Sequence, residues 1–383
     1  MLCARRVGGA VGCQRLPMVL PAALCLLLLG PAGTSASPSC ADDAGCSYNG
    51  RCSRGACACR PQWTGPHCAS LRLLPTPRGA GLHGTNEPAV PADPERPLGA
   101  QPRRGYWGSS VLRGDDGRWH MWSAEMTAGC GIWAWCSNSQ IVHAVSSTPV
   151  GTYTRKEVAQ KVWAHEPTVS RAPTGEFVMF FTSAPWGPNG QPPVNATHFA
   201  PCNCTTLEST QRCGWSDLTA PVPGVTPPPI GYLSHGMPTF MSWAKEPAGP
   251  WSPPMSIPIR GLGDANFAFT IRKDGSLWGM GREAVYMATD WKDNSTYSFF
   301  SNTTGVIGED PYVWIDETSS GRTVFHMLRH CNTSEGTPST HGQPFGSHAW
   351  SVDGGFTWES FGAEHAYPRW ATFTDAPNQT YVR

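Results

Sequence analysis

The stretch FAFTIRKDGSLWGMGR, residues 267–282, holds the pattern that decides the fold of most of this chain. Two short aromatic runs flank Asp274-Gly275, and an Asp-Gly pair between alternating apolar runs is a strong hairpin signal. Comparable units span residues 109–126, 167–183, 311–330 and 348–360. Repeated hairpins without helical periodicity predict small antiparallel sheets arranged radially. We therefore expect an all-β fold, a five-bladed β-propeller over residues 105–383, in which the fifth blade is not plainly completed before Arg383.

The amino-acid composition argues against some classes of binding partner. The 383 residues carry 28 basic and 28 acidic side chains and a formal net charge of zero, which argues against nucleic acid and anionic membranes. Only 15% of residues are charged, whereas there are 42 Gly, 37 Pro and 17 Trp. This balance is typical of a β-rich extracellular protein.

The N-terminus predicts a signal peptide over residues 1–36. Arg5, Arg6 and Arg15 precede an apolar run, residues 18–29, which small residues follow. A membrane span needs roughly 20 apolar residues, so this run favours cleavage over the alternative of an uncleaved anchor. The sequence thus predicts a secreted, extracellular protein without a membrane span in its mature chain.

Residues 38–69 contain six closely spaced cysteines. A segment this short needs cross-links to fold, and a secreted chain favours disulfides over the rival zinc site. The Cys57-Ala-Cys59 pair, Tyr48-Asn49-Gly50 and the run from Trp63 to Cys68 resemble the EGF-like family. That resemblance implies the disulfides Cys40–Cys52, Cys46–Cys57 and Cys59–Cys68, whereas the sequence alone permits fifteen connectivities. No acidic cluster precedes Cys40, so we expect no calcium in this module.

Residues 70–104 are rich in Pro and Gly and predict an extended linker. In the large domain six further cysteines are expected to be paired, although the sequence does not assign the pairs: Cys130, Cys136, Cys202, Cys204, Cys213 and Cys331. Sequons predict a glycoprotein modified at Asn195, Asn203, Asn294, Asn302, Asn332 and Asn378.

Short motifs recur where the strands of successive units begin. They are the run from Trp163 through His165-Glu166-Pro167, then Gly308-Glu309-Asp310-Pro311, and Gly346-Ser347-His348. These motifs resemble the five-bladed propeller glycosidases of the arabinanase, xylosidase and invertase group. A rival resemblance, Ser351-Val-Asp353-Gly-Gly-Phe-Thr357-Trp358, fits the Asp-box turn of sialidases, which is a structural hairpin.

The glycosidase resemblance implies two-carboxylate chemistry. Glu309 matches the family's acid, which a crowded negative site would keep protonated, and Asp264 matches the Asp that orients it. The family's base is an Asp opening the first blade, where this chain has Trp107-Gly108-Ser109. The second strand of a hairpin ends beside the start of the first strand, and we call this end of the sheets the rim. Glu125, at the end of the second strand of the first blade, is the nearest candidate for the base at this rim, and Glu166 is the other.

The same rim is expected to bind substrate. We expect the contacts to come from His165, Glu166, Asp310, His348 and Trp107, the last by stacking on a sugar face. The alternative is structural, because a carboxylate or histidine at a strand entry also accepts hydrogen bonds from backbone amides.

Three functions follow from this sequence. The first is a glycoside hydrolase acting on an extracellular or cell-wall polysaccharide, without a redox cofactor, although a structural Ca²⁺ or Na⁺ in the channel is compatible with the fold. The second is a catalytically inactive carbohydrate-binding propeller, favoured by the missing first-blade Asp. The third is an adhesion protein that acts through its EGF-like module.

Overall fold

A computed structural model of the chain describes residues 40–77, 81–83, 105–126, 139–161, 164–182, 239–258, 267–281, 284–302, 308–331, 346–361, 364–368, 370–377 and 380–382. The expected signal peptide lies outside these residues. Within them, no helix is both long enough and apolar enough to cross a membrane.

The small module is built around its cysteines. Its elements are the 3-10 helix η1 Asp43–Cys46 and the strands β1 Gly50–Ser53, β2 Ala56–Cys59, β3 Trp63–Thr64 and β4 Ser70–Leu71. Disulfides join Cys40 to Cys52, Cys46 to Cys57 and Cys59 to Cys68, which is the pairing that the EGF-like resemblance implies.

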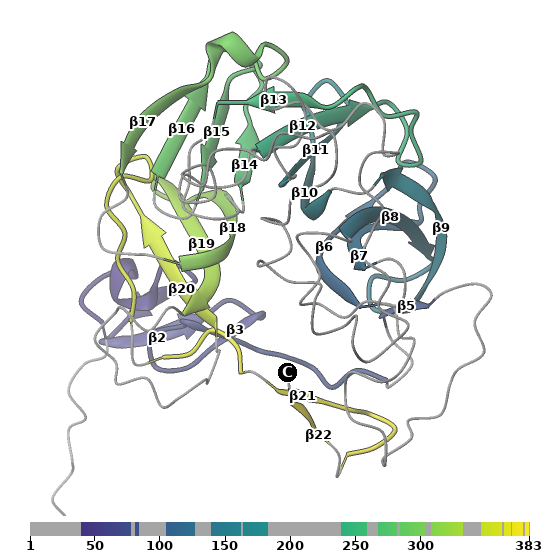
Figure 1. Ribbon diagram of the computed structural model, residues 1–383. Coiled ribbons are helices and arrows are strands. Elements are labelled where there is room, and N and C mark those ends of the chain that lie inside the picture. Colours follow the sequence, from purple (N-terminus) through teal and green to yellow (C-terminus); the bar gives the residue numbers. More distant parts are fainter. Residues whose placement is uncertain are drawn as a thin grey trace, which may run out of the picture. The chain divides into compact units, whose positions relative to one another are not determined.

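Four antiparallel sheets follow along the chain (Figure 1). The first contains β6 Tyr106–Arg113, β7 Trp119–Met126, β8 Ser139–Ser146 and β9 Thr152–Gln160, and β5 Gly81–His83 adds in parallel to β9. The second contains β10 His165–Arg171, β11 Phe177–Thr182, β12 Thr239–Ala244 and β13 Met255–Ile257. The third contains β14 Ala268–Ile271, β15 Leu277–Met280, β16 Ala284–Ala288 and β17 Ser298–Asn302. The fourth contains β18 Gly308–Glu317, β19 Thr323–Cys331 and β20 Gly346–Ser351.

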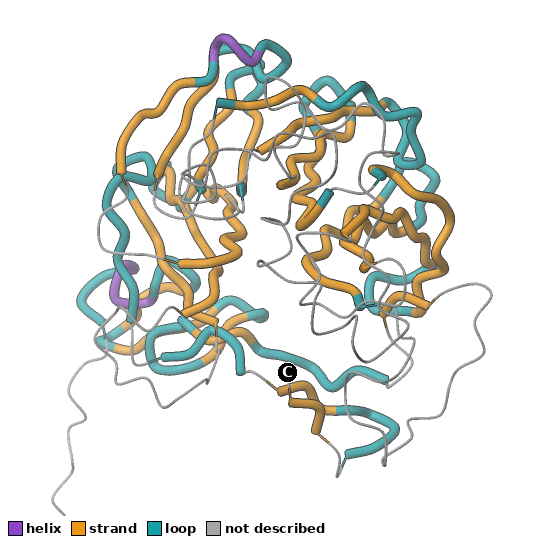
Figure 2. The backbone as a smooth tube through the Cα atoms, in the orientation of Figure 1, coloured by secondary structure: helices purple, strands orange, loops and turns teal. Residues whose placement is uncertain are grey.

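Strands account for nearly all the regular structure in the described residues, as Figure 2 shows. The helical pieces among them are η1 and a second 3-10 turn, η7 Asn294–Thr296. A last hairpin joins β21 Trp370–Thr372 to β22 Thr380–Val382. The all-β expectation is confirmed.

Successive sheets pack face to face through aromatic side chains. The ring centroids of Trp122 in the first sheet and Phe177 in the second lie 5.8 Å apart. Those of Phe180 in the second sheet and Phe269 in the third lie 4.5 Å apart. Side chains alternate between the faces of a strand, so β11 serves two cores: Phe177 packs toward the first sheet and Phe180 toward the third. Successive sheets that pack face to face in this way form a propeller-like arrangement.

The predicted fifth unit is not the start of a fifth blade. His348 lies in β20, the third strand of the fourth sheet, and Trp350 pairs with Glu359 across the Asp-box turn. The unit therefore joins the third strand of that sheet to its outer edge. An Asp-Gly turn closes any hairpin of a blade, so the local pattern does not reveal which two strands it connects. Four blade-like sheets are present in the described residues, and the count of five is not confirmed.

Candidate functional site

The first strands of three sheets open with the same backbone irregularity. A register shift interrupts the pairing of β6 with β7, β10 with β11 and β18 with β19 near the start of the first strand. A residue with left-handed backbone lies at each shift: Gly108 at φ 47°, Glu166 at φ 50° and Asp310 at φ 52°. Glu166 and Asp310 are carboxylates in a conformation that favours glycine, which costs about 1–3 kcal/mol each and is common at functional sites.

Glu166 links the first two sheets at this bulge. Its Oε1 accepts a hydrogen bond of 2.6 Å from Nε1 of Trp107, and His165 Nε2 lies 3.7 Å away. A Cβ added at Gly108 would lie 3.0 Å from Cγ of Glu166, so the first strand approaches this side chain closely. We expected the ring of Trp107 to stack on a sugar face, and its indole N–H also orients the Glu166 carboxylate.

His165 supports the same corner from the inside. It is 4% exposed, and its Nδ1 lies 2.8 Å from Oγ of Ser139. Burial lowers the pKa of His165 to about 3, so the imidazole is neutral near neutral pH. A neutral imidazole at this position can orient its neighbours without adding charge.

Glu125 ends the second strand of the first sheet, but its carboxylate is fully engaged. Arg155 of β9 donates to both oxygens at 2.9 and 3.1 Å, and Gln140 donates to Oε1 at 2.7 Å. The Glu125 side chain is 2% exposed. A buried carboxylate in a bidentate arginine pair is screened from substrate.

The remaining expected site residues are described only in part. Glu309 pairs in register with His330 at the start of β18, next to Asp310, but its side chain lies outside the described part of the structure. Asp264 lies outside the described residues altogether. The structure therefore brings Trp107, His165 and Glu166 together and leaves the geometry of the Glu309 and Asp264 side chains open.

His348 does not lie at a first-strand entry as we expected. It is 2% exposed in β20, its Nε2 lies 3.0 Å from Nδ1 of His326, and its ring centroid lies 4.8 Å from that of Trp63 in the small module. The expectation treated the Asp-box hairpin as the first hairpin of a fifth blade. The structure instead places His348 on the third strand of the fourth sheet.

Sequence reasoning missed two arginines. Arg155 pairs with Glu125, and Arg329 of β19 is fully buried. Both lie on strands, and Arg329 continues the buried alternation of Phe325 and Met327. This alternation was the signal available in the sequence, because an Arg that replaces an apolar residue at an inward position needs a polar partner.

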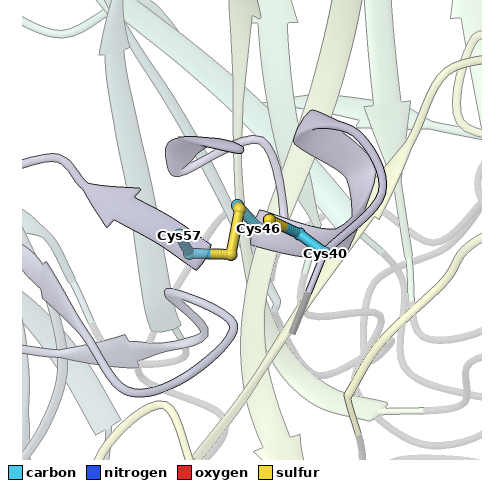
Figure 3. Close-up of side chains that lie close together, drawn as sticks. All are labelled: Cys40, Cys46 and Cys57. Atoms are coloured by element: carbon cyan, nitrogen blue, oxygen red, sulfur yellow. A yellow bond between two sulfur atoms is a disulfide. The ribbon is translucent and has the colours of Figure 1, made fainter. Parts of the chain in front are cut away.

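Among the described residues, one group of potential metal ligands has its donor atoms within 4.8 Å of one another: Cys40, Cys46 and Cys57. Figure 3 shows these side chains side by side. All three sulfurs belong to disulfides, so none is a thiolate that could bind a metal. Of the sequons, Asn294 and Asn302 are described, and the Asn294 amide donates to the Ser256 carbonyl at 3.1 Å. The other four sequons and the side chain of Cys331 lie outside the described part, as do the other five cysteines that we expect to be paired in the large domain.

Parts of this chain are similar to known proteins. Residues 40–70 match the family described as the teneurin-like EGF domain. No curated protein matches the chain. Similar solved structures include an α-L-arabinofuranosidase of Fusarium graminearum, with 10% identity and a TM-score of 0.42 over 67% of this chain and 60% of that protein. A family 117 glycoside hydrolase of Zobellia galactanivorans has 12% identity and a TM-score of 0.43 over 72% of this chain and 75% of that one.

A GH43 protein of Bacillus licheniformis has 12% identity and a TM-score of 0.40 over 68% of this chain and 42% of its own. The chain thus covers 60% of the arabinofuranosidase and 42% of the GH43 protein.

Proposed function

We propose that this protein is a secreted glycoside hydrolase that cleaves O-glycosidic bonds in an extracellular or cell-wall glycan. The observation that carries the proposal is the pair Glu166 and Asp310, two carboxylates in left-handed backbone at matching bulges of β10 and β18. Bulges of this kind re-aim side chains and are frequent next to active sites. Glu309, the expected acid, directly precedes Asp310.

Cleavage requires one carboxylic acid that protonates the leaving oxygen and one carboxylate that acts as base or nucleophile. We assign the acid to Glu309 and its orientation to Asp264, as the glycosidase resemblance implies. We assign the second carboxylate to Glu166 in preference to Glu125. Trp107 holds the Glu166 carboxylate at a strand entry, whereas Arg155 and Gln140 occupy both oxygens of Glu125.

The test is sugar release from arabinan, xylan, fructan and galactan by the full-length secreted protein. Glu309→Gln and Glu166→Gln should each lower the release rate by about 100-fold or more, because each removes a group that transfers a proton or attacks the substrate. Glu317→Gln is the matched control, since Glu317 lies exposed at the opposite end of the same strand as Glu309. Equal release by the parent and Glu309→Gln would refute the assignment of the acid.

The second candidate is a carbohydrate-binding propeller without activity. The engagement of Glu125 by Arg155 favours it, because the first sheet then offers no carboxylate comparable to the family's base. Retention of the parent on an insoluble glycan without release of sugar, together with equal retention of Glu309→Gln, would support this function over hydrolysis.

A further inference from the structure

The fourth sheet has one face that none of the other three blade-like sheets covers among the described residues. Its opposite face packs on the third sheet, where Trp278 lies 5.0 Å from Phe325. Side chains alternate along β19, so His326 and Leu328 point away from the third sheet. In a propeller with a further blade, this second face would pack on that blade, just as the second and third sheets each pack on a blade-like sheet on both sides.

The EGF-like module covers this face. Trp63 of the module is 3% exposed, and its ring lies 6.2 Å from that of Trp314 in β18 at an interplanar angle of 25°. Leu328 and Trp314 pack against the module's core of Trp63 and half-cystines. The contact continues the series of aromatic pairs that joins the sheets to one another.

Polar contacts fix the orientation of the module on the sheet. Arg60 donates to Asp316 at 2.6 Å, and Arg322 donates to the hydroxyl of Tyr48 at 3.1 Å. The Asn49 amide lies 3.4 Å from the imidazole of His348. These pairs match polar groups of the module with polar groups of β18, of the turn between β18 and β19, and of β20.

The segment after the module continues toward the first sheet. The Leu71 amide donates to the carbonyl of Ala366 at 2.7 Å, and Thr76 forms a bridge with Phe373 near the C-terminus. Further along, β5 pairs in parallel with β9, the outer strand of the first sheet. One continuous piece of chain thus contacts both the fourth and the first sheet.

We infer that the EGF-like module takes the place of a fifth blade, and that with residues 70–83 and the C-terminal segment it closes the propeller between its fourth and first sheets. Its role is then to be part of the propeller fold, which differs from the spacer or adhesion module that the sequence suggested. Removing it would expose an apolar face around Trp314, and the module alone would expose Trp63. Each part therefore stabilises the other.

A cut between His83 and Gly105 tests this inference on the full-length protein. A protease site is introduced there, and the cut protein is passed over a gel-filtration column under native conditions. The module's disulfides all lie within residues 40–68, so none of them holds its fragment covalently. We expect the fragment to elute with the sheets. Release of the fragment from the parent protein would overturn the inference.

Variants at the interface separate docking on the fourth sheet from the pairing of β5. Trp314→Ser should release the fragment, and Arg60→Met should speed its dissociation roughly two- to five-fold, the range expected for a partly exposed ion pair. Arg54→Met, exposed in the turn between β1 and β2, is the control and should leave the rate unchanged. Because Trp314→Ser can also disturb the sheet, Arg60→Met decides the result: dissociation at the rate of the control would show that the fourth sheet does not hold the module.

Discussion

Gly355 lies where the fourth sheet meets Trp278 of the third sheet. Its φ is 88°, and a Cβ added there would lie 2.4 Å from Cζ2 of Trp278. The neighbouring Gly354 carbonyl accepts a hydrogen bond of 2.9 Å from the Trp278 indole. At the scale of single residues, a glycine of the Asp-box turn thus lets a strand of the third sheet dock on the fourth.

Gly355→Ala should therefore lower the free energy of unfolding by about 3 kcal/mol, the sum of backbone strain and overpacking against Trp278. Gly275→Ala is the matched control: Gly275 has a φ of 84° but no atom within 4 Å of its added Cβ, so it should cost about 1 kcal/mol. Urea unfolding of both variants gives the comparison. Equal losses would contradict the proposed contact with Trp278.

At the scale of the elements, the face of the fourth sheet that the module covers carries two buried histidines, His326 and His348. Burial lowers the pKa of His326 to about 4, although Asp316 partly opposes this shift and Arg60 adds to it. Burial and the neighbouring His326 lower the pKa of His348. Both imidazoles are neutral when the module is docked, and they lie within 3.0 Å of each other. Protonating either one places a charge beneath Trp63.

The protein should therefore lose stability in acid. An unfolded histidine titrates near 6.5 and the folded His326 near 4, so the unfolded chain binds more protons between these values. The stability that depends on neutral His326 is fully present above about pH 6.5. Below that, the free energy of unfolding falls by about 1.4 kcal/mol per pH unit down to about pH 4. Urea unfolding at pH 7.5, 6.0 and 5.0 should show a shallower fall for His326→Asn than for the parent. Parallel curves for the two proteins would count against this role of His326.

At the scale of the whole molecule, the module and the four sheets should unfold as one unit. The module holds Trp63 in place by disulfides, and Trp63 covers the fourth sheet. The connection of residues 70–83 to both the C-terminal segment and β9 extends this dependence to the first sheet. Damage to the module is thus expected to reach strands that are distant in sequence.

Replacing Cys46 and Cys57 together by Ala tests this dependence. Loss of one disulfide costs a small module about 2–4 kcal/mol, and the docked sheet should lose protection with it. We expect faster hydrogen exchange at the amides of β19 and β20 as well as in the module. Faster exchange confined to residues 40–71 would show that the module and the sheets unfold independently.

Local sequence was sufficient for the features that depend on neighbouring residues. The cysteine spacing identified the module. Turns of the type Asp-Gly, Thr-Gly or Ser-Gly between aromatic runs located the first hairpin of each of the four sheets, because turn geometry and side-chain alternation are set over a few residues. The same patterns placed Glu166 and Asp310 at strand entries, although they did not show the left-handed backbone there.

Only the tertiary structure decided which strands share a sheet and what covers each face. The turn around Asp353 looks like any other hairpin, yet it completes the fourth sheet, and so His348 faces the module. Glu125 and Arg155 are thirty residues apart, and their pairing depends on the register of β7, β8 and β9. Such contacts join segments far apart in the chain, and their partners are chosen by packing, burial and charge compensation across the whole fold, which no short stretch of sequence contains.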